Sequence, residues 1–79
     1  MERDLKIGAI YQHYKGMRYK VNAIVLHSET LEELVFYEAL YENKIGKLWV
    51  RPKTMFLELI AINGIQVARF AELPESNLN

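Results

Sequence analysis

The chain has 79 residues, with 10 basic and 10 acidic side chains, so its formal net charge is zero. A neutral chain lacks the overall positive field that draws proteins to nucleic acids or anionic membranes. Cysteine is absent, which excludes disulfides, thiolate zinc sites, Fe–S clusters and thiol catalysis.

The composition predicts one small, soluble, globular domain. Hydrophobic residues make up 51% and charged residues 25%, which is typical of chains that fold. Because no apolar run is long enough to cross a bilayer and the charged stretch Met1–Lys6 has no apolar segment behind it, we expect neither membrane contact nor a signal peptide. The lack of cysteine favours a reducing cytoplasm.

The first predicted element is a β-hairpin. Segments rich in β-formers, Ala9–Tyr14 and Met17–His27, flank the turn signal Lys15-Gly16. With a two-residue turn, Gln12 would face Tyr19 across the pair. That register predicts an apolar face of Ile10, Tyr14, Met17, Tyr19 and Val21, and a solvent face of Tyr11, His13, Arg18 and Lys20.

The middle of the chain predicts two more strands. Thr30, with a glutamate three residues later, matches a capping box and predicts a single helical turn. Leu34–Tyr41 favours a strand because of its β-branched and aromatic residues, although helical spacing is the rival interpretation. After a loop at Glu42–Lys47, the short strand Leu48–Arg51 ends at Pro52, which cannot donate to a ladder.

A second hairpin closes the predicted fold. Phe56–Ile62 and Ile65–Phe70 flank Asn63-Gly64, the strongest turn signal in the chain and typical of a type I′ turn. The implied register pairs Ile62 with Ile65, Ile60 with Val67, and Glu58 with Arg69. Ala71–Asn79 should be a mobile tail.

These elements predict an all-β domain, an SH3-like barrel-roll of about five antiparallel strands with short helical turns. An open sheet this small would leave an apolar face uncovered and two edges bare, so a barrel is favoured. The predicted organisation is a leader at residues 1–7, the barrel at 8–70 and a flexible tail at 71–79.

Several blocks of the sequence form a recognisable set. They are Tyr11–Gly16, His27–Val35, Tyr37, Ala39–Tyr41, Leu48–Pro52, Met55-Phe56 and Arg69-Phe70. Together they resemble a known family, the small bacterial domain of unknown function 1653, over about residues 8–70. The resemblance implies an SH3-type barrel-roll but no activity, since the family's function is unassigned. Members often have a proline before the closing Arg-Phe, where this chain has Ala68, and a compact glycine-rich turn in place of its loop at 42–46.

The leading functional hypothesis is a non-enzymatic module that binds a peptide or protein partner near Trp49, Arg51 and Tyr37. Aromatic side chains lining a groove with an arginine at its end are how small barrels hold extended peptides. Tyr41 belongs to the same aromatic group, and we add His27 and Glu29 of the polar loop to the candidate binding residues.

Period two places Trp49 and Arg51 on one face of their strand and Leu48 and Val50 on the other. If the leucine and valine are core, Trp49 and Arg51 are at least partly exposed. In the alternative, Trp49 is core and Arg51 pairs with a glutamate, either Glu29 or Glu33.

The predicted solvent face of the first hairpin supports a different hypothesis, a nucleic-acid-binding barrel. Tyr11, His13, Arg18 and Lys20, with Lys15 at the tip, combine aromatic stacking surfaces with positive charge. Zero net charge weakens the electrostatic case. A thin core with exposed aromatic groups also makes a symmetric homodimer plausible.

A third hypothesis is a small-molecule hydrolase or lyase built around His27, Glu29 and Arg51. Ser28 beside His27 is a poor nucleophile–base pair because adjacent strand residues point to opposite faces. We therefore favour a loop whose polar side chains bind main-chain amides. The two histidines, His13 and His27, match no closed ligand pattern even with nearby glutamates, so we expect no bound metal and no cofactor.

Overall fold

The computed structural model describes residues 4–74, which form a mostly-β domain with one short helix. Two antiparallel sheets are present, one of five strands in the order β4-β3-β2-β1-β7 and one of two strands, β5-β6. The predicted all-β class is confirmed, with seven strands in this part of the chain instead of about five. In chain order the elements are β1 (Ile10–His13), β2 (Arg18–Leu26), β3 (Glu33–Ala39), β4 (Leu48–Pro52), α1 (Lys53–Phe56), β5 (Leu59–Ile62), β6 (Ile65–Ala68) and β7 (Phe70–Glu72).

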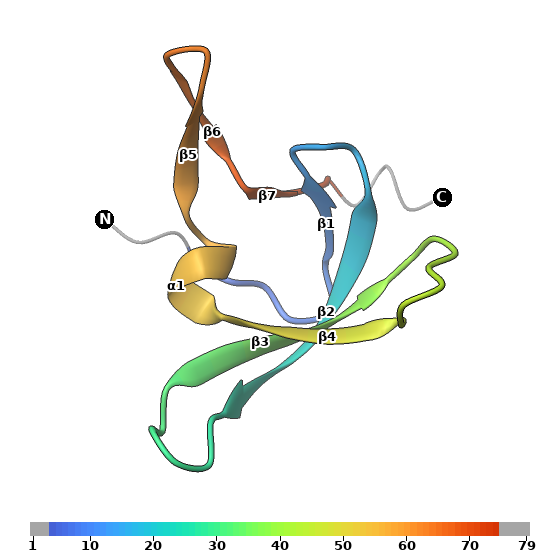
Figure 1. Cartoon of the computed structure of the whole chain (residues 1–79), viewed down its shortest axis with the longest axis vertical. Coiled ribbons are helices and arrows are strands. Elements are labelled where there is room, and N and C mark those ends of the chain that lie inside the picture. Colours follow the sequence, from blue (N-terminus) through green and yellow to red (C-terminus); the bar gives the residue numbers. More distant parts are fainter. Residues whose placement is uncertain (1–3, 75–79) are drawn as a thin grey trace.

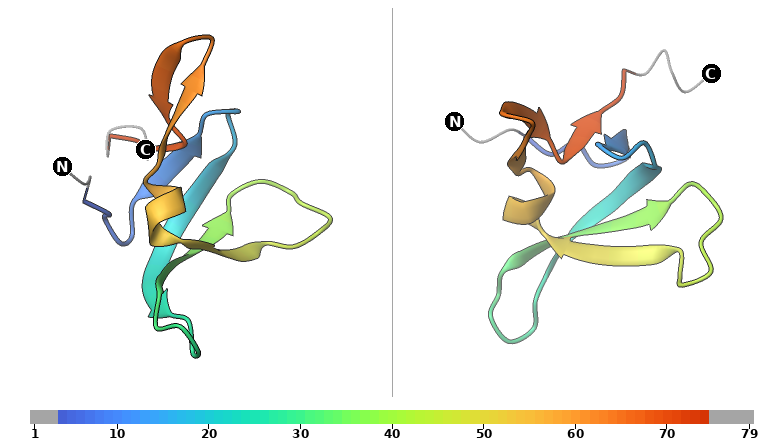
Figure 2. Two further views of the ribbon diagram at one scale, coloured as in Figure 1. Left: turned by 60° about the vertical axis from the view of Figure 1, so that its left-hand side comes forward. Right: turned by 45° about the horizontal axis from the view of Figure 1, so that its top comes forward.

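The five-stranded sheet curls around its inner face (Figures 1 and 2). The long strand β2 pairs with β1 in its first part and with β3 along most of its length. A register shift between Val21 and Ala23 places a bulge at Asn22. Bulges bend the strand and increase its twist, so this one helps to wrap the sheet around the core.

The core lies on the inner face and is mainly aromatic. Phe56 from α1 and Phe70 from β7 stack with ring centroids 4.1 Å apart and planes 4° from parallel. Large aromatic side chains supply most of the buried apolar surface that a chain this small can collect. The buried residues are Tyr11, Tyr19, Val21, Val35, Tyr37, Ala39, Phe56 and Phe70.

The predicted turn of the first hairpin is wrong by one residue. The amide of His13 donates to the carbonyl of Met17 at 2.8 Å, and the amide of Gly16 donates to the carbonyl of His13 at 2.7 Å. These bonds close a three-residue loop at 14–16 instead of a two-residue turn. Gly16 has a φ of +108°, which a side chain would disfavour.

The extra loop residue moves every side chain of β1 to the other face of the sheet. Tyr11, not Gln12, is opposite Tyr19. Tyr11 is therefore a core residue, 2% exposed, and the amide of Lys6 donates to its hydroxyl at 3.0 Å. Arg18 and Lys20 lie on the outer face and are exposed.

The second hairpin has the predicted register. Ile62 pairs with Ile65 and Ile60 with Val67. At its base, the carboxylate of Glu58 lies 2.6 Å from the guanidinium of Arg69. The Asn-Gly turn therefore sets the pairing locally, as expected.

The elements on either side of this hairpin differ from the prediction. Residues 53–56 form α1, so the strand predicted from Phe56 begins at Leu59. The strand predicted over Ile65–Phe70 breaks at Arg69, and β7 then turns to pair with β1. Ala71 and Glu72, predicted to start a mobile tail, belong to β7, while residues 75–79 of that tail lie outside the described part.

Candidate functional site

The inner face of β4 carries Trp49 and Arg51. They pair with Tyr37 and Val35 of β3, whose side chains are buried. Directly paired residues of neighbouring strands share a face, so the remaining residues of β4 point outward, with Leu48 63% exposed. The interpretation that Leu48 and its neighbour at position 50 are core is wrong, because the core lies on the Trp49 side.

Arg51 lies against the aromatic core and has no acidic partner within residues 4–74. Its Cζ atom is 5.5 Å from the centroid of the Phe70 ring. Phe56 stacks on the same ring, with centroids 4.1 Å apart. The Nε of Arg51 donates to the Tyr37 hydroxyl at a long 3.5 Å. Among residues 4–74 no carboxylate lies within 4.0 Å of it, and Glu33, one predicted partner, pairs with Lys53 at 3.5 Å.

His13 packs on the same phenylalanine ring as Arg51. The centroids of His13 and Phe70 are 4.9 Å apart, with planes at 79°. The Nδ1 atom of His13 accepts a hydrogen bond of 3.1 Å from the amide of Lys15, so the neutral ring carries its proton on Nε2. Burial lowers the pKa of His13, and the positive charges of Arg51, Lys15 and Arg69 lower this pKa further. The surroundings of His13 are thus electropositive.

Tyrosine hydroxyls extend this region toward the β3–β4 loop. The hydroxyls of Tyr19 and Tyr41 are 2.7 Å apart, and the side-chain amide of Asn43 donates to Tyr41 at 3.4 Å. Burial, followed by the hydrogen bond to Tyr41, raises the pKa of Tyr19. The Tyr19 hydroxyl therefore stays protonated at neutral pH and offers a dipole instead of a negative charge.

Beside Tyr41, the β3–β4 loop encloses one side of an open hollow of about 840 Å³. The indole Nε1 of Trp49 donates to the carbonyl of Gly46 at 3.1 Å and thereby ties the loop to β4. We call the region formed by His13, Tyr37, Tyr41, Trp49 and Arg51 the Arg51 surface. The hollow that adjoins it is lined by Ala39, Leu40, Tyr41, Glu42, Asn43, Lys44 and Lys47.

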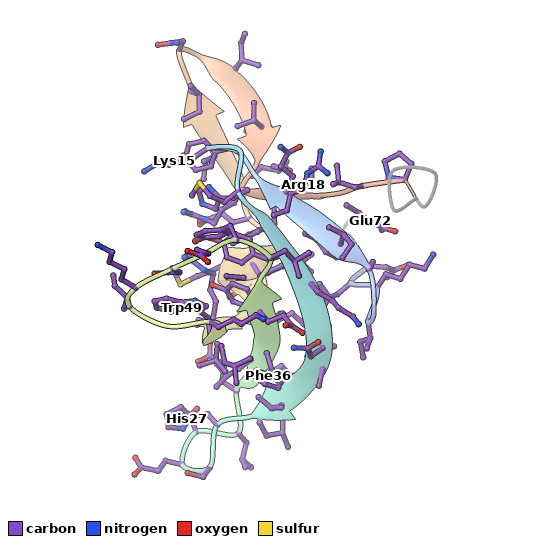
Figure 3. The ribbon with its side chains drawn as sticks, turned by 90° about the vertical axis from the view of Figure 1, so that its right-hand side faces the viewer. Lys15, Arg18, His27, Phe36, Trp49 and Glu72 are labelled. Atoms are coloured by element: carbon purple, nitrogen blue, oxygen red, sulfur yellow. The ribbon has the colours of Figure 1, made fainter. Side chains whose placement is uncertain are left out.

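Charge is unevenly distributed along the sheet despite the zero net charge. The turn with Lys15 and the loop with Lys44 and Lys47 lie at one end, where the amide of Leu40 donates to the carbonyl of Arg18 at 3.0 Å. The β2–β3 connection lies at the other end, as the labels Lys15 and His27 show in Figure 3, and carries the exposed glutamates 29, 32 and 33. Of the Arg51 surface, His13 and Tyr41 adjoin the basic turn and loop, whereas Arg51 itself pairs with Val35, two residues from Glu33 at the start of β3.

The structure separates His27 and Glu29 from the other candidate binding residues. The Nδ1 atom of His27 accepts hydrogen bonds from the amides of Glu29 and Thr30, at 3.1 and 3.3 Å. In the described chain, no hydrogen bond or ion pair links either residue to Arg51. The helical turn predicted at Thr30 is instead a non-helical turn, in which Leu31 has a φ of +61°.

The four residues proposed for nucleic-acid binding do not share a face, which corrects that prediction. Tyr11 is in the core and His13 is on the inner face beside Phe70, whereas Arg18 and Lys20 point outward. The prediction therefore missed the contribution of His13 to the Arg51 surface. A three-residue loop ending in glycine is a known hairpin class, so Gly16 carried a signal for the correct register.

The described residues offer neither a metal-binding cluster nor a membrane-spanning helix. Within residues 4–74, no three histidine, aspartate or glutamate side chains come together in a group that could hold a metal ion. The helix in this range, α1, has four residues, and no helix here is long and apolar enough to cross a membrane.

Comparisons with known proteins identify the family. The family model described as "Protein of unknown function (DUF1653)" matches residues 9–72. The fold is similar to the crystal structure of a DUF1653 protein from Bordetella bronchiseptica, with a TM-score of 0.82, 27% sequence identity and 92% of each chain covered. No curated protein matches the sequence significantly. The chain therefore belongs to the DUF1653 family, whose function is unknown.

Proposed function

We propose that this chain is a non-enzymatic interaction module, an SH3-like domain of the bacterial cytoplasm that binds a peptide or protein partner at the Arg51 surface. The observation that carries the proposal is the half-buried Arg51, held against Phe70 without an acidic partner among the described residues. Partial burial removes hydration from a guanidinium, and such a group is normally paired. A partner that supplies a negative group would complete the pairing.

The surroundings of Arg51 suit recognition. Tyrosine, tryptophan and arginine are the residues that most often dominate the binding energy of protein interfaces. Trp49 lies on the same face of β4 as Arg51, Tyr41 packs against Tyr19 of the inner face, and the Tyr37 hydroxyl accepts from the Arg51 Nε. The aromatic core beneath them is buried, and side chains that are already packed lose less conformational entropy when a partner docks.

The rival functions have less support. A nucleic-acid interface would need Tyr11 and Arg18 on one face, and the register separates them. A hydrolase centred on His27 would need that histidine near Arg51, yet its Nδ1 is engaged by amides of its own loop. Binding at the Arg51 surface requires no rearrangement of the fold.

The test compares two variants that lose the same charge. The tagged full chain, the Arg51→Ala variant and the Arg18→Ala variant are used to capture proteins from a bacterial lysate, after circular dichroism has confirmed that each is folded. Arg18 is exposed on the outer face and serves as the matched control. We expect a reproducible partner that the wild type and Arg18→Ala retain and Arg51→Ala loses. If Arg51→Ala captures the same partner as the wild type does, the proposal is contradicted.

A further inference from the structure

We infer that the group recognised at Arg51 is a carboxylate, carried by an acidic peptide segment of the partner. The inference rests on the proposed function and names the chemistry of the ligand at that same site.

The guanidinium of Arg51 is arranged to make an end-on bidentate contact. The Cζ atom lies 5.5 Å from the centroid of the Phe70 ring, and the Nε donates to the Tyr37 hydroxyl at 3.5 Å. These contacts do not use the two terminal nitrogens, which remain available to a ligand. The two nitrogens form a planar fork that matches the two oxygens of a carboxylate. Because the side chain is already held, less rotamer freedom is lost on binding than at a freely moving surface arginine.

A single guanidinium at the centre of the site favours a carboxylate over a phosphate. Phosphorylated segments are typically bound by clusters of arginines or by several main-chain amides. The second arginine near His13 is Arg69, and its guanidinium is already engaged by Glu58 at 2.6 Å. One carboxylate is therefore the charge that this site balances.

Exposed lysines at the basic end of the sheet favour further negative charge on the partner. Lys15, Lys44 and Lys47 form no ion pair within the described residues and are exposed at the basic end. Neutral His13 offers an Nε2 proton to an acceptor. The hollow beside Tyr41 provides space for a chain that continues from the carboxylate, and its lining carries two lysines, Lys44 and Lys47, against one acidic residue, Glu42. An acidic segment is thus complementary to the lysines of this loop.

The experiment titrates the ¹⁵N-labelled full chain with short synthetic peptides at low salt. The first peptide is acetylated, amidated and contains glutamates, the second replaces every glutamate with glutamine, and the third is the glutamine peptide with a free C-terminal carboxylate. A fourth carries phosphoserine in place of glutamate. The second and third peptides together separate a side-chain carboxylate from a C-terminal one, and the fourth tests the phosphate.

We expect the glutamate peptide, the C-terminal carboxylate peptide or both to shift the amides of β4 and the Arg51 Nε signal, while the neutral peptide leaves them unchanged. Arg51→Ala should weaken binding about tenfold to a hundredfold, the loss typical of a charged hydrogen-bonded contact. Arg51→Lys should also lose affinity, because lysine keeps the charge without the fork. Arg18→Ala should bind as the wild type does.

Several outcomes would overturn the inference. They are equal binding of the glutamate and glutamine peptides, full affinity in Arg51→Lys, and binding of the phosphoserine peptide alone. If the chain captures a partner through Arg51 and yet no carboxylate peptide binds, the proposed function is supported and the inference of a carboxylate ligand is wrong. Self-association through the acidic loop of a second copy would show as line broadening that depends on protein concentration without peptide, and would also count against a peptide ligand.

Discussion

The five-stranded sheet and the β5–β6 hairpin are stabilised in different ways. The sheet closes over a cluster of aromatic rings from α1, β1, β2, β3 and β7, in which Phe56 and Phe70 stack and the other rings meet edge to face. The hairpin stands out from the body (Figure 1), and its apolar side chains Leu59, Ile62 and Ile65 are 52%, 39% and 67% exposed. Its pairing depends on the main-chain ladder and the Asn63-Gly64 turn.

This difference indicates that the sheet is the cooperative unit and the hairpin a local one. An isolated two-stranded hairpin is only marginally stable in water, whereas buried aromatic contacts are lost all together when the sheet opens. Glu58 and Arg69 fasten the base of the hairpin by a main-chain bond of 2.9 Å and a side-chain ion pair of 2.6 Å. We therefore expect substitutions in the two regions to differ in how much they lower the free energy of unfolding and in how many strands they affect.

The largest effect is predicted for Phe70→Ala. Phe70 is 1% exposed and contacts the rings of Phe56, Tyr19, Tyr37 and His13. Truncating a buried phenylalanine costs about 3–5 kcal/mol in the free energy of unfolding, a large part of the stability of a small domain. Urea denaturation followed by circular dichroism measures the loss.

Two further variants make the Phe70 result interpretable. Phe70→Leu retains part of the packing. It provides a folded variant with a smaller loss of stability if the alanine variant does not fold. Val50→Ala, on the outer face of β4 at 55% exposure, should change the free energy of unfolding by less than about 0.5 kcal/mol. Equal losses in Phe70→Ala and Val50→Ala would show that the aromatic core is not the dominant source of stability.

A smaller and local effect is predicted for Gly64→Ala. Gly64 has a φ of +79°, and nothing lies within 4 Å of the place where a Cβ would be. The substitution therefore introduces backbone strain without a steric clash, at a cost of about 1–2 kcal/mol. Hydrogen exchange should speed up for the amides of β5 and β6 and remain unchanged for those of β2 and β3.

If Gly64→Ala accelerates exchange throughout β2 and β3, the hairpin and the sheet unfold together and the comparison fails. Gly46→Ala is a suitable control. It lies in the β3–β4 loop without a positive φ and also has nothing within 4 Å of its added Cβ, so it should leave exchange in β5 and β6 unaltered.

The same contrast explains what the sequence could predict about the fold. The β5–β6 register is encoded locally by Asn63-Gly64, so the pairs through Ile60 and Val67 could be predicted. The register of the first hairpin could not be settled from the Lys15-Gly16 signal alone, because two- and three-residue loops both fit it. The burial of Tyr11 in the core is a tertiary effect that decides between the two loop lengths.

The candidate site was predictable only in part, for a related reason. Period two correctly placed Trp49 and Arg51 on one face, but which face is buried depends on Phe56 and Phe70, which arrive from distant parts of the chain. The side chain of His13 joins Arg51 through Phe70 and not through sequence proximity. The alternation of side chains along a strand could not predict that His13 and Arg51 pack on the same ring.

The smallest predicted effect concerns His13, which lies between the two regions. It lines a hollow of about 470 Å³ that the first hairpin shares with Ile62 and Val67 of the second. Its folded pKa is lowered from the ordinary 6.5 by burial and by Arg51, Lys15 and Arg69, the last already paired with Glu58. Between that lowered pKa and 6.5, the unfolded chain binds more protons than the folded one.

The free energy of unfolding should therefore fall as the pH drops through 6.5, with the loss complete below the folded pKa of His13. Urea denaturation of the wild type and His13→Gln at about pH 7.5 and about pH 5.5 measures the difference, since the glutamine variant lacks this titration. His27→Gln controls for the removal of one histidine. Hydrogen exchange at the lower pH should show the loss in β1 and β2 before β5 and β6, because His13 belongs to the sheet. An identical pH dependence in the wild type and His13→Gln would mean that neither burial nor the positive groups around His13 lower its pKa.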